Sequence, residues 1–416
     1  MRRLDLVAVV VNGVIGAGIF GLPSKVFSLS GGYSLLAFGI CALSVAIIVL
    51  SFCEVASRYS GSGGPYLYAR ETYGPTVGFA VGSLLWVARI TSFAANCNLL
   101  PEYLDLFFPG SASGAGRVFI ITGTVTALAA VNLLGVRRVA DASNTFAIGK
   151  LLPLAVFIVA GLFFVDPARF TFAAVPDYRS FSKSVLLLVY AFTGFEMAVI
   201  PAGETRNPQR NLPAALIAGM AIVVVFYVLI QTVCIGTLPG LAASSRPLAD
   251  AAFRFWGPWG AAMVTTGMVI SLAGNLNVLI LAASRVVFAM AEWGDLPRGL
   301  AAVHPRRRTP VGSVLFTTIV MLVFTLSGTF IYLLTLSTLS RLVTYFVTCT
   351  AVPVLRRRAT APPAAFLMPA GVGVATAGMA LALWLLSNST LREARDTAAA
   401  AALGLGIYWL NRRVQS

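Results

Sequence analysis

Apolar stretches of about 20 residues follow one another along most of the chain, separated by short breaks rich in charged residues, glycine and proline. Such runs are long enough to cross the hydrocarbon core of a bilayer as helices. Strands of an outer-membrane barrel would instead alternate apolar and polar residues. The pattern predicts an all-α integral membrane protein with twelve transmembrane helices, at residues 6–27, 34–57, 77–106, 117–135, 144–165, 183–203, 213–236, 259–290, 311–328, 330–355, 364–387 and 397–412.

The composition agrees with a membrane protein. Of the 416 residues, 58% are hydrophobic and only 11% are charged, which is too apolar for a water-facing surface. The loops are short, so we expect one transmembrane domain over residues 1–416. The first segment has the basic start of a signal peptide but a poor cleavage pattern, so we expect an uncleaved first helix.

The basic residues gather in the loops and predict the orientation. If the amino terminus is cytoplasmic, 18 of the 30 lysines and arginines fall in cytoplasmic loops and 9 in outside loops. This bias is typical of cytoplasmic loops, so both termini are expected on the cytoplasmic side of the cell (inner) membrane. The net charge of +15 therefore does not indicate nucleic-acid binding, because the basic residues follow no single face.

No residue cluster predicts an enzyme, a metal site or a cofactor. The single histidine, His304, lies in a predicted loop without nearby ligands. The five cysteines all fall in apolar segments, which indicates buried small side chains rather than disulfides. Neither a nucleophile elbow nor a nucleotide-binding loop is present.

Two predicted helices contain residues that favour unwinding. Residues 12–23 of the first segment hold four glycines and Pro23, and the sixth segment holds Thr193-Gly194 near its middle, followed by Pro201 and Gly203. Glycine costs about 1 kcal/mol relative to alanine in a helix interior. These segments open two halves of five helices each, and broken helices at corresponding positions indicate an inverted-repeat transporter with its site near the midplane.

Unwound backbone within a bilayer exposes N–H and C=O groups that lipid cannot satisfy. Free amides at the start of a helix suit a carboxylate, and free carbonyls suit an ammonium group. A zwitterionic amino acid matches both. The alternative is that these glycines only allow neighbouring helices to pack closely.

Two motifs resemble signatures of the amino acid-polyamine-organocation (APC) permeases. They are GAGIF at residues 16–20, and FTGFE at 192–196 followed by PAGETRNPQRNLP at 201–213. The resemblance covers nearly the whole chain. It implies a LeuT-type fold with a 5+5 inverted repeat and discontinuous helices 1 and 6. Repeat one would span residues 6–165 and repeat two residues 183–355, with two additional helices at 364–412.

The resemblance also implies a substrate site built mainly from backbone groups. The first break would hold the substrate carboxylate through amides, and both breaks would take its amino group through carbonyls. Such a site leaves the side chain of the substrate unspecified. The amides are those of Ala17, Gly18 and Ile19, next to Gly16; the carbonyls are those of Val14, Ile15, Phe192 and Thr193; Tyr190, Phe192 and Phe195 are nearby walls or gates, and Gly194 and Glu196 complete the second motif.

Four predicted helices carry a charge near the middle: Arg89, Lys150, Glu196 and Arg341. Each costs roughly 2.5–3.5 kcal/mol at the bilayer centre, so pairing, water or function should compensate. Glu196 either takes up protons or accepts bonds from N–H groups at its own helix start. The arginines either favour an acidic substrate or tie helices together through backbone carbonyls.

Lys150 lies about two turns from the cytoplasmic end of the fifth segment. By resemblance to proton-coupled and exchanging relatives, its ammonium stands where sodium-coupled relatives hold a sodium ion. It would bridge the first segment, near the Gly13 carbonyl, to the fifth and eighth segments, and Ser271 and Asn275 of the eighth are expected to lie close. Loss of its proton would release this bridge and bias the two access states. The alternative is a lysine that snorkels to the interface.

These observations predict a secondary active amino acid transporter that is sodium-independent, either proton-coupled or exchanging, and that alternates access around a midplane site. A polyamine or organic-cation exchanger is the alternative within transport, and it requires a carboxylate facing the site, for which Glu196 is the central candidate. A channel or a non-transporting membrane sensor is the alternative from another class. A channel requires a continuous lined pore, whereas two isolated breaks are present.

Overall fold

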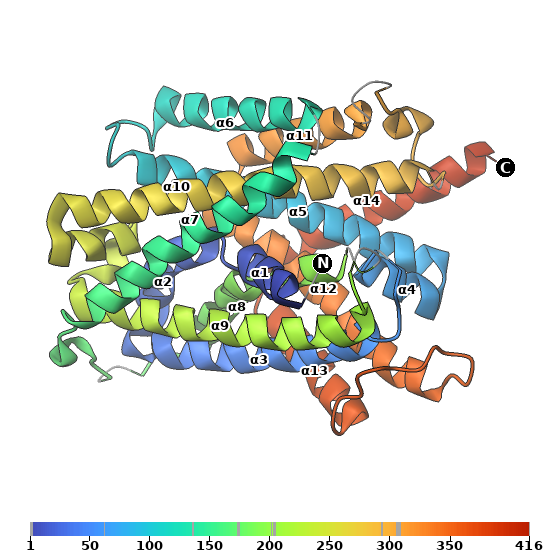
Figure 1. Ribbon diagram of the computed structural model, residues 1–416, viewed down its shortest axis with the longest axis horizontal. Coiled ribbons are helices and arrows are strands. Elements are labelled where there is room, and N and C mark those ends of the chain that lie inside the picture. Colours follow the sequence, from blue (N-terminus) through green and yellow to red (C-terminus); the bar gives the residue numbers. More distant parts are fainter. Residues whose placement is uncertain are drawn as a thin grey trace.

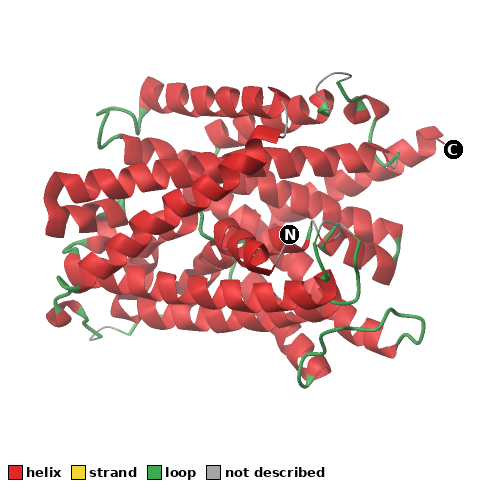
Figure 2. Cartoon of the chain, viewed as in Figure 1, coloured by secondary structure: helices red, strands yellow, loops and turns green. Residues whose placement is uncertain are grey.

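The computed structural model describes residues 3–61, 63–134, 137–172, 175–200, 202, 205–292, 294–304 and 309–415. The described residues form helices joined by loops, with no strand among them (Figure 2). The helices are α1 (Arg3–Val14), α2 (Ala17–Ser30), α3 (Ser34–Ala56), α4 (Pro65–Tyr73), α5 (Pro75–Leu104), α6 (Gly114–Leu134), α7 (Arg137–Leu162), α8 (Tyr178–Phe192), α9 (Pro208–Thr237), α10 (Pro247–Glu292), α11 (Val311–Ser327), α12 (Phe330–Arg357), α13 (Gly371–Ser387) and α14 (Leu391–Gln415), with short 3₁₀ helices η1 (Gly31–Tyr33), η2 (Pro167–Arg169), η3 (Phe195–Val199), η5 (Leu241–Ala243) and η6 (Arg298–Ala301).

Every predicted segment corresponds to helix in the structure, and the all-helical prediction is confirmed for the described residues. The first segment is two helices, α1 and α2, and the sixth is α8 followed by η3. Within the described part of the chain, seven helices are long and apolar enough to cross a membrane, or eight if α13 and α14, which are bent by 116°, count together. The count of twelve crossings stays a prediction.

Proline and glycine explain where several helices begin. Proline is the first residue of α4, α5 and α9, where its missing N–H leaves no helical bond unmade. Gly64 and Gly74, with φ of 55° and 96°, precede α4 and α5 and allow the sharp entry. The short helix α4 was not among the predicted segments, because it lies in a polar stretch between two of them.

The helices pack into one bundle with α5 near its middle. Helix α5 contacts α10, α11 and α12, whereas α9 contacts α1 and α3. Figure 1 shows α3 and α9 side by side, with α1 near the centre of the view. Helix α1 also contacts η3, and α2 contacts α8, so the two interrupted segments lie against each other.

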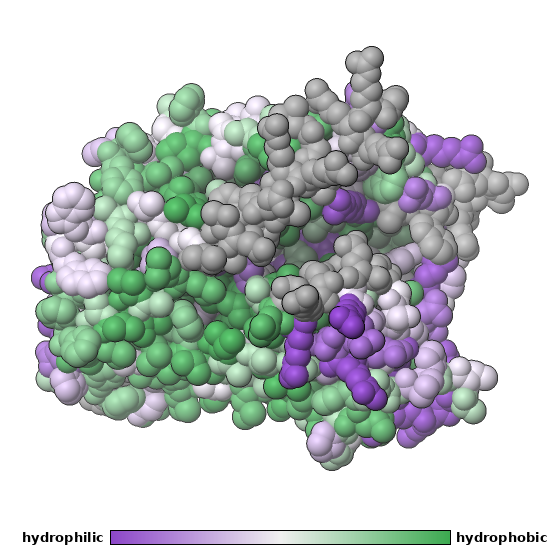
Figure 3. Space-filling model, in the orientation of Figure 1, coloured by the Kyte–Doolittle hydropathy of each residue, from purple (hydrophilic) through white to green (hydrophobic). Residues whose placement is uncertain are grey.

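The outer surface of the bundle is apolar over wide areas. Figure 3 shows hydrophobic residues across the middle of one face, with hydrophilic residues gathered mostly toward the right of the view. Large side chains such as Phe119, Phe163 and Ile319 are exposed. A surface of this extent needs an apolar environment, which a lipid bilayer provides.

The helix of the eleventh predicted segment begins seven residues later than expected, because the first part of this segment binds the end of α3. Residues 364–370 were predicted as helix, but α13 starts at Gly371. The amide of Phe366 donates to Ser57 Oγ, and the amide of Met368 donates to Glu54 Oε2 at 3.2 Å. These backbone donors are satisfied by side chains, so the segment does not need helical bonds.

Glu54 joins three parts of the chain at this end of the bundle. Its side chain is fully buried and receives Arg356 Nε at 2.7 Å, Arg356 Nη2 at 2.6 Å and Arg58 Nη2 at 3.3 Å. Arg58 Nη1 also donates to the Pro362 carbonyl. The carboxylate therefore holds α3, α12 and the segment before α13 together.

Replacing Glu54 by glutamine should lower the free energy of unfolding by at least about 1.5–3 kcal/mol, the typical contribution of a hydrogen bond to a charged group. The change leaves Arg356 and Arg58 without their shared anion. The measurement is thermal unfolding of the detergent-purified protein. Asp166→Asn is the control, because its ion pair with Arg169 is largely exposed and should contribute about 0–1 kcal/mol. Equal melting temperatures for the two variants would contradict the prediction.

Candidate functional site

The two interrupted helices touch at their breaks, backbone against backbone. Helix α1 ends at Val14 and α2 begins at Ala17, while α8 ends at Phe192 and η3 begins at Phe195. Gly194 has a φ of 113°, which favours glycine. A Cβ atom on Gly194 would lie 2.2 Å from the Gly13 carbonyl oxygen, and one on Gly13 would lie 2.8 Å from the Gly194 carbonyl oxygen. Both glycines are therefore needed for this approach.

A cavity of about 120 Å³ borders the contact between the breaks. A water molecule needs about 10–15 Å³ by this measure, so the cavity has room for a molecule of several heavy atoms. It is lined by α1, the start of α2, α5, the end of α8, α10 and α12. Of the residues expected at the site from the sequence, Gly13, Val14, Gly16, Ala17, Gly18, Tyr190, Thr193, Gly194 and Asn275 line it.

The other expected residues do not line the cavity. Phe192 packs against Phe38 and Tyr227, and Phe195 packs against Phe52 and Tyr345, with ring centroids 5.1–6.5 Å apart. The rings of Phe192 and Phe195 therefore pack on either side of the second break, and not at the cavity wall, where they were expected. Ile15, Ile19, Glu196, Lys150 and Ser271 are also buried outside the lining.

Two of the four break carbonyls expected to take an amino group, those of Val14 and Ile15, already accept hydrogen bonds from the protein. The single O–H of Tyr227 is shared between the Val14 carbonyl at 3.1 Å and the Ala191 carbonyl at 2.9 Å. Lys150 Nζ donates to the Ile15 carbonyl at 3.1 Å. Each carbonyl keeps a second lone pair. The site is thus partly satisfied by side chains from α9 and α7, and Tyr227 was not found from the sequence.

Lys150 binds the first break, although its partners differ from the expected ones. Its Nζ donates to the Asn12 carbonyl at 2.9 Å as well as to Ile15, and the side chain is 1% exposed, so it does not snorkel. The expected Gly13 carbonyl faces Gly194 instead. A helix end offers successive carbonyls, and the ammonium meets those on either side of Gly13.

The two expected partners on α10 make no hydrogen bond with Lys150. The Oδ1 of Asn275 accepts from Asn96 Nδ2 at 2.7 Å. Ser271 Oγ is buried and has no hydrogen-bond partner among the described residues. The two hydrogen bonds of Lys150 in the described structure therefore both go to the first break, and none goes to Ser271 or Asn275.

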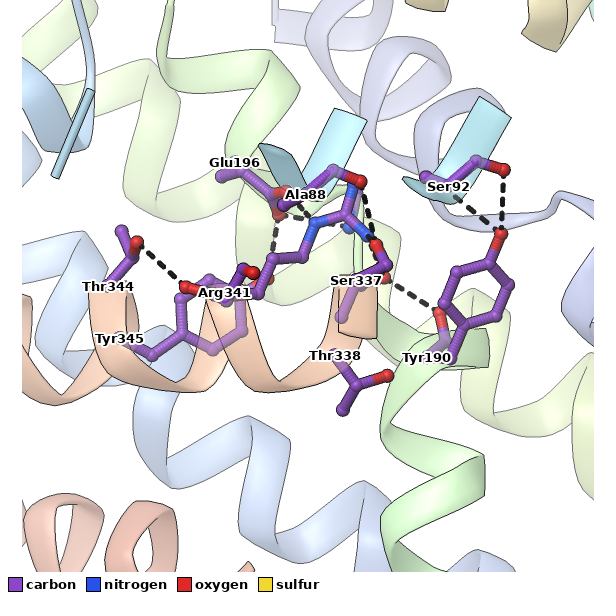
Figure 4. A network of polar contacts seen from close by, with 12 residues as sticks. Ala88, Ser92, Tyr190, Glu196, Ser337, Thr338, Arg341, Thr344 and Tyr345 are labelled. Atoms are coloured by element: carbon purple, nitrogen blue, oxygen red, sulfur yellow. Dashed lines mark hydrogen bonds and ion pairs between the residues drawn. The ribbon is translucent and has the colours of Figure 1, made fainter. Parts of the chain in front are cut away.

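Glu196 and Arg341 form a buried ion pair beside the second break. Arg341 Nε lies 2.9 Å from Glu196 Oε1, and Nη1 donates to Thr193 Oγ1 at 3.0 Å and to Ser337 Oγ at 2.9 Å. Figure 4 shows the Arg341 side chain reaching toward Glu196, with Ser337 beside it. This pairing joins α12 to the second break and was not expected from the sequence.

The second oxygen of Glu196 binds the break itself. Glu196 Oε2 accepts from the Gly194 amide and from Tyr345 Oη, both at 2.9 Å. Of the two roles considered for Glu196, acceptance of N–H groups at its own helix start agrees with this contact. Pro201, Gly203 and Glu204 of the same motif lie outside the described residues.

A second polar network joins α5, α8 and α10 at the cavity wall. Tyr190 Oη contacts Ser92 Oγ at 3.2 Å and donates to Asn96 Oδ1, and Asn96 in turn donates to Asn275. A Cβ on Gly16 would lie 3.7 Å from Asn275 Nδ2 and 3.8 Å from Asn96 Nδ2. The side-chain amides of Asn96 and Asn275 therefore border the first break. Asn96 was not predicted as a site residue from the sequence, because single asparagines and serines in apolar helices form no recognisable motif.

Comparison with known proteins identifies the relatives of this chain. A family model described as amino acid permease matches residues 2–407. The chain is 28% identical to the serine/threonine exchanger SteT of Bacillus subtilis, over 97% of this chain and 93% of that protein. It is 26% identical to the branched-chain amino acid permease BcaP of the same bacterium, over 100% and 93%. Its identity to the methylthioribose transporter of that bacterium is also 26%, over 100% and 94%.

Gly194→Ala should destabilise the protein by about 1–3 kcal/mol through overpacking alone, with further strain from the positive φ. The added methyl group would push the two breaks apart. Gly39→Ala is the matched control, since a Cβ there meets no atom within 4 Å and alanine favours the helix. Thermal unfolding in detergent compares the two. An unchanged melting temperature for Gly194→Ala would show that the breaks do not need this contact.

Proposed function

The chain belongs to the amino acid permease family, and we propose that it moves its substrate by alternating access around the cavity between the two breaks. Its relatives are transporters rather than enzymes. The chain is an amino acid transporter that lies in a membrane, and it has a LeuT-like fold of many helices. The proposal concerns the place and coupling of transport. The observation that supports it most strongly is the direct contact of Gly13 with Gly194 beside the cavity.

The substrate head group would bind at the first break. The amides of Ala17 and Gly18, in the first turn of α2, have no intrahelical acceptor and line the cavity. They suit a carboxylate, aided by the positive end of the α2 dipole. The amino group would share carbonyls at the end of α1 and at Thr193, which also borders the cavity. The relatives are named for different substrates, so the choice of substrate would depend on side chains of this chain.

For the repeat boundaries and the orientation, we propose those that the sequence predicts. Repeats over residues 6–165 and 183–355 would place the two breaks in corresponding helices, with the helices of residues 364–412 outside the repeats. The excess of basic residues in alternate loops supports cytoplasmic termini in the cell membrane.

Lys150 would act as the coupling cation. Its ammonium crosses from α7 to the carbonyls of Asn12 and Ile15, where a sodium ion would also find oxygen ligands. A fixed positive charge at this position disfavours a second cation. Transport without sodium is therefore expected, and exchange or proton coupling would depend on making and breaking these two hydrogen bonds.

The polyamine or organic-cation alternative is weaker than the amino acid proposal. It needs an available carboxylate at the cavity. Both oxygens of Glu196 already bind donors, from Arg341 on one side and from Gly194 and Tyr345 on the other. A cationic substrate would have to displace Arg341 from a buried ion pair, which leaves an unpaired buried charge.

Lys150→Met should reduce amino acid uptake by roughly tenfold or more, because it removes charged hydrogen bonds worth about 1.5–3 kcal/mol each. The measurement is uptake of labelled amino acids into proteoliposomes, with and without sodium, at matched reconstitution. Wild-type uptake should be the same in both buffers.

Lys183→Met is the matched control for this experiment. Lys183 is a partly exposed lysine that pairs with Glu393 at 3.2 Å, away from the cavity. It should transport like the wild type. A requirement for sodium, or wild-type uptake by Lys150→Met, would reject the coupling role, whereas the amino acid transport itself would still stand.

A further inference from the structure

We propose that the transported amino acid carries an acidic side chain, recognised by the positive charge of Arg341, which lines the cavity, and of Arg89, which is buried on α5 one turn before the cavity-lining Ser92. This inference rests on the proposed function, because it assumes that the cavity holds the substrate. It concerns the part of the substrate that the backbone breaks leave unspecified.

The charges near the cavity do not balance among the described side chains. Arg89, Lys150 and Arg341 are buried in the middle of their helices, and the buried carboxylate of Glu196 pairs with Arg341. Glu54 is also buried, but it binds Arg58 and Arg356 at the end of α3. Glu196 pairs with Arg341, so the positive charges of Arg89 and Lys150 have no carboxylate partner among the described side chains.

Glu196 is fully used by its present partners. Its two oxygens receive Arg341, Tyr345 and the Gly194 amide. Arg341 is bonded through Nε and Nη1, whereas its Nη2 has no hydrogen-bond partner among the described residues. Because Arg341 lines the cavity, this nitrogen is a donor available to a bound molecule.

Arg89 is the cation without a partner. Its side chain is 3% exposed, and within the described structure it makes no hydrogen bond and no ion pair. It lies one residue after Ala88, whose carbonyl accepts from Ser337 Oγ at 2.8 Å, and one turn before Ser92 at the cavity wall (Figure 4).

An uncompensated buried guanidinium is strongly unfavourable unless an anion approaches it. Arginine can tie helices together through carbonyls, but Arg89 makes no such bond to any described group. The head group of an amino acid is a neutral zwitterion and would be satisfied at the breaks. The anion that balances the two arginines would then be a carboxylate on the substrate side chain.

The experiment compares acids with amides of nearly the same shape. The uptake rate of L-glutamate is compared with that of L-glutamine, and the uptake rate of L-aspartate with that of L-asparagine. Each rate is measured with purified protein in proteoliposomes, in chloride and in gluconate buffers. The expected result is a preference of roughly tenfold or more for at least one acid over its amide, as charge pairing at a buried site supplies. The wild type alone tests this point, whatever the variants do.

Variants then assign the preference to Arg89. Arg89→Gln should bring the acid and its amide to within about twofold of each other, and Arg89→Lys should restore part of the preference. Arg254→Gln is the matched control, because Arg254 is exposed on α10 and does not line the cavity. It should keep the wild-type preference.

Each other outcome overturns a defined part of the proposal. Equal uptake of acid and amide rejects the acidic substrate but leaves amino acid transport intact. Uptake of neutral amino acids that needs chloride, and loses this need in Arg89→Gln, shows that an inorganic anion balances the arginines instead. An unchanged preference in Arg89→Gln removes Arg89 from the recognition. Absence of uptake for every amino acid rejects the proposed function itself.

Discussion

The bared peptide groups at the two helix breaks are the constraint on which the rest of the structure depends. Lipid offers no hydrogen-bond partner, so every N–H and C=O released by unwinding must find one in the protein or in a ligand. Lys150 binds the carbonyls of Asn12 and Ile15, and Tyr227 binds that of Val14. Glu196 takes the amide of Gly194. Side chains from α7, α9 and η3 thus stabilise an irregular backbone at the centre of an apolar bundle.

The partners of the breaks differ in what they require. Tyr227 is neutral and brings only a hydroxyl group, whereas Lys150 and Glu196 bring charge into a region where charge is unfavourable. Glu196 is compensated by Arg341, but Lys150 meets only carbonyl dipoles among the described residues. A charge held by dipoles alone is easier to change by loss of a proton than one held in an ion pair. This difference makes the first break the more natural place for coupling and the second the more natural place for a fixed connection.

Local chemistry allowed the helices and the position of both breaks to be predicted. Gly13, Gly16 and Gly194 stand out in the sequence because glycine weakens a membrane helix and permits close approach. The partners of the breaks could not be predicted in the same way. Tyr227 binds Val14 across 213 residues, and Arg341 binds Glu196 across 145 residues. Their pairing depends on how the helices pack, and no local pattern records it. The resemblance suggested Lys150, but which carbonyls it meets depends on the rotation of the end of α1.

The kinds of contact around the cavity also indicate which parts move together. Gly13 and Gly194 meet through backbone alone, with no side chain that can change rotamer, so α1 and η3 are expected to behave as one unit. Helices α7 and α12 meet this unit through single side chains, from Lys150 and Arg341. Such contacts can break and form again without disturbing a packed core, which alternation between two access states requires. The rigid contact and the exchangeable ones therefore divide the molecule along the walls of the cavity, where a substrate would bind both sides at once.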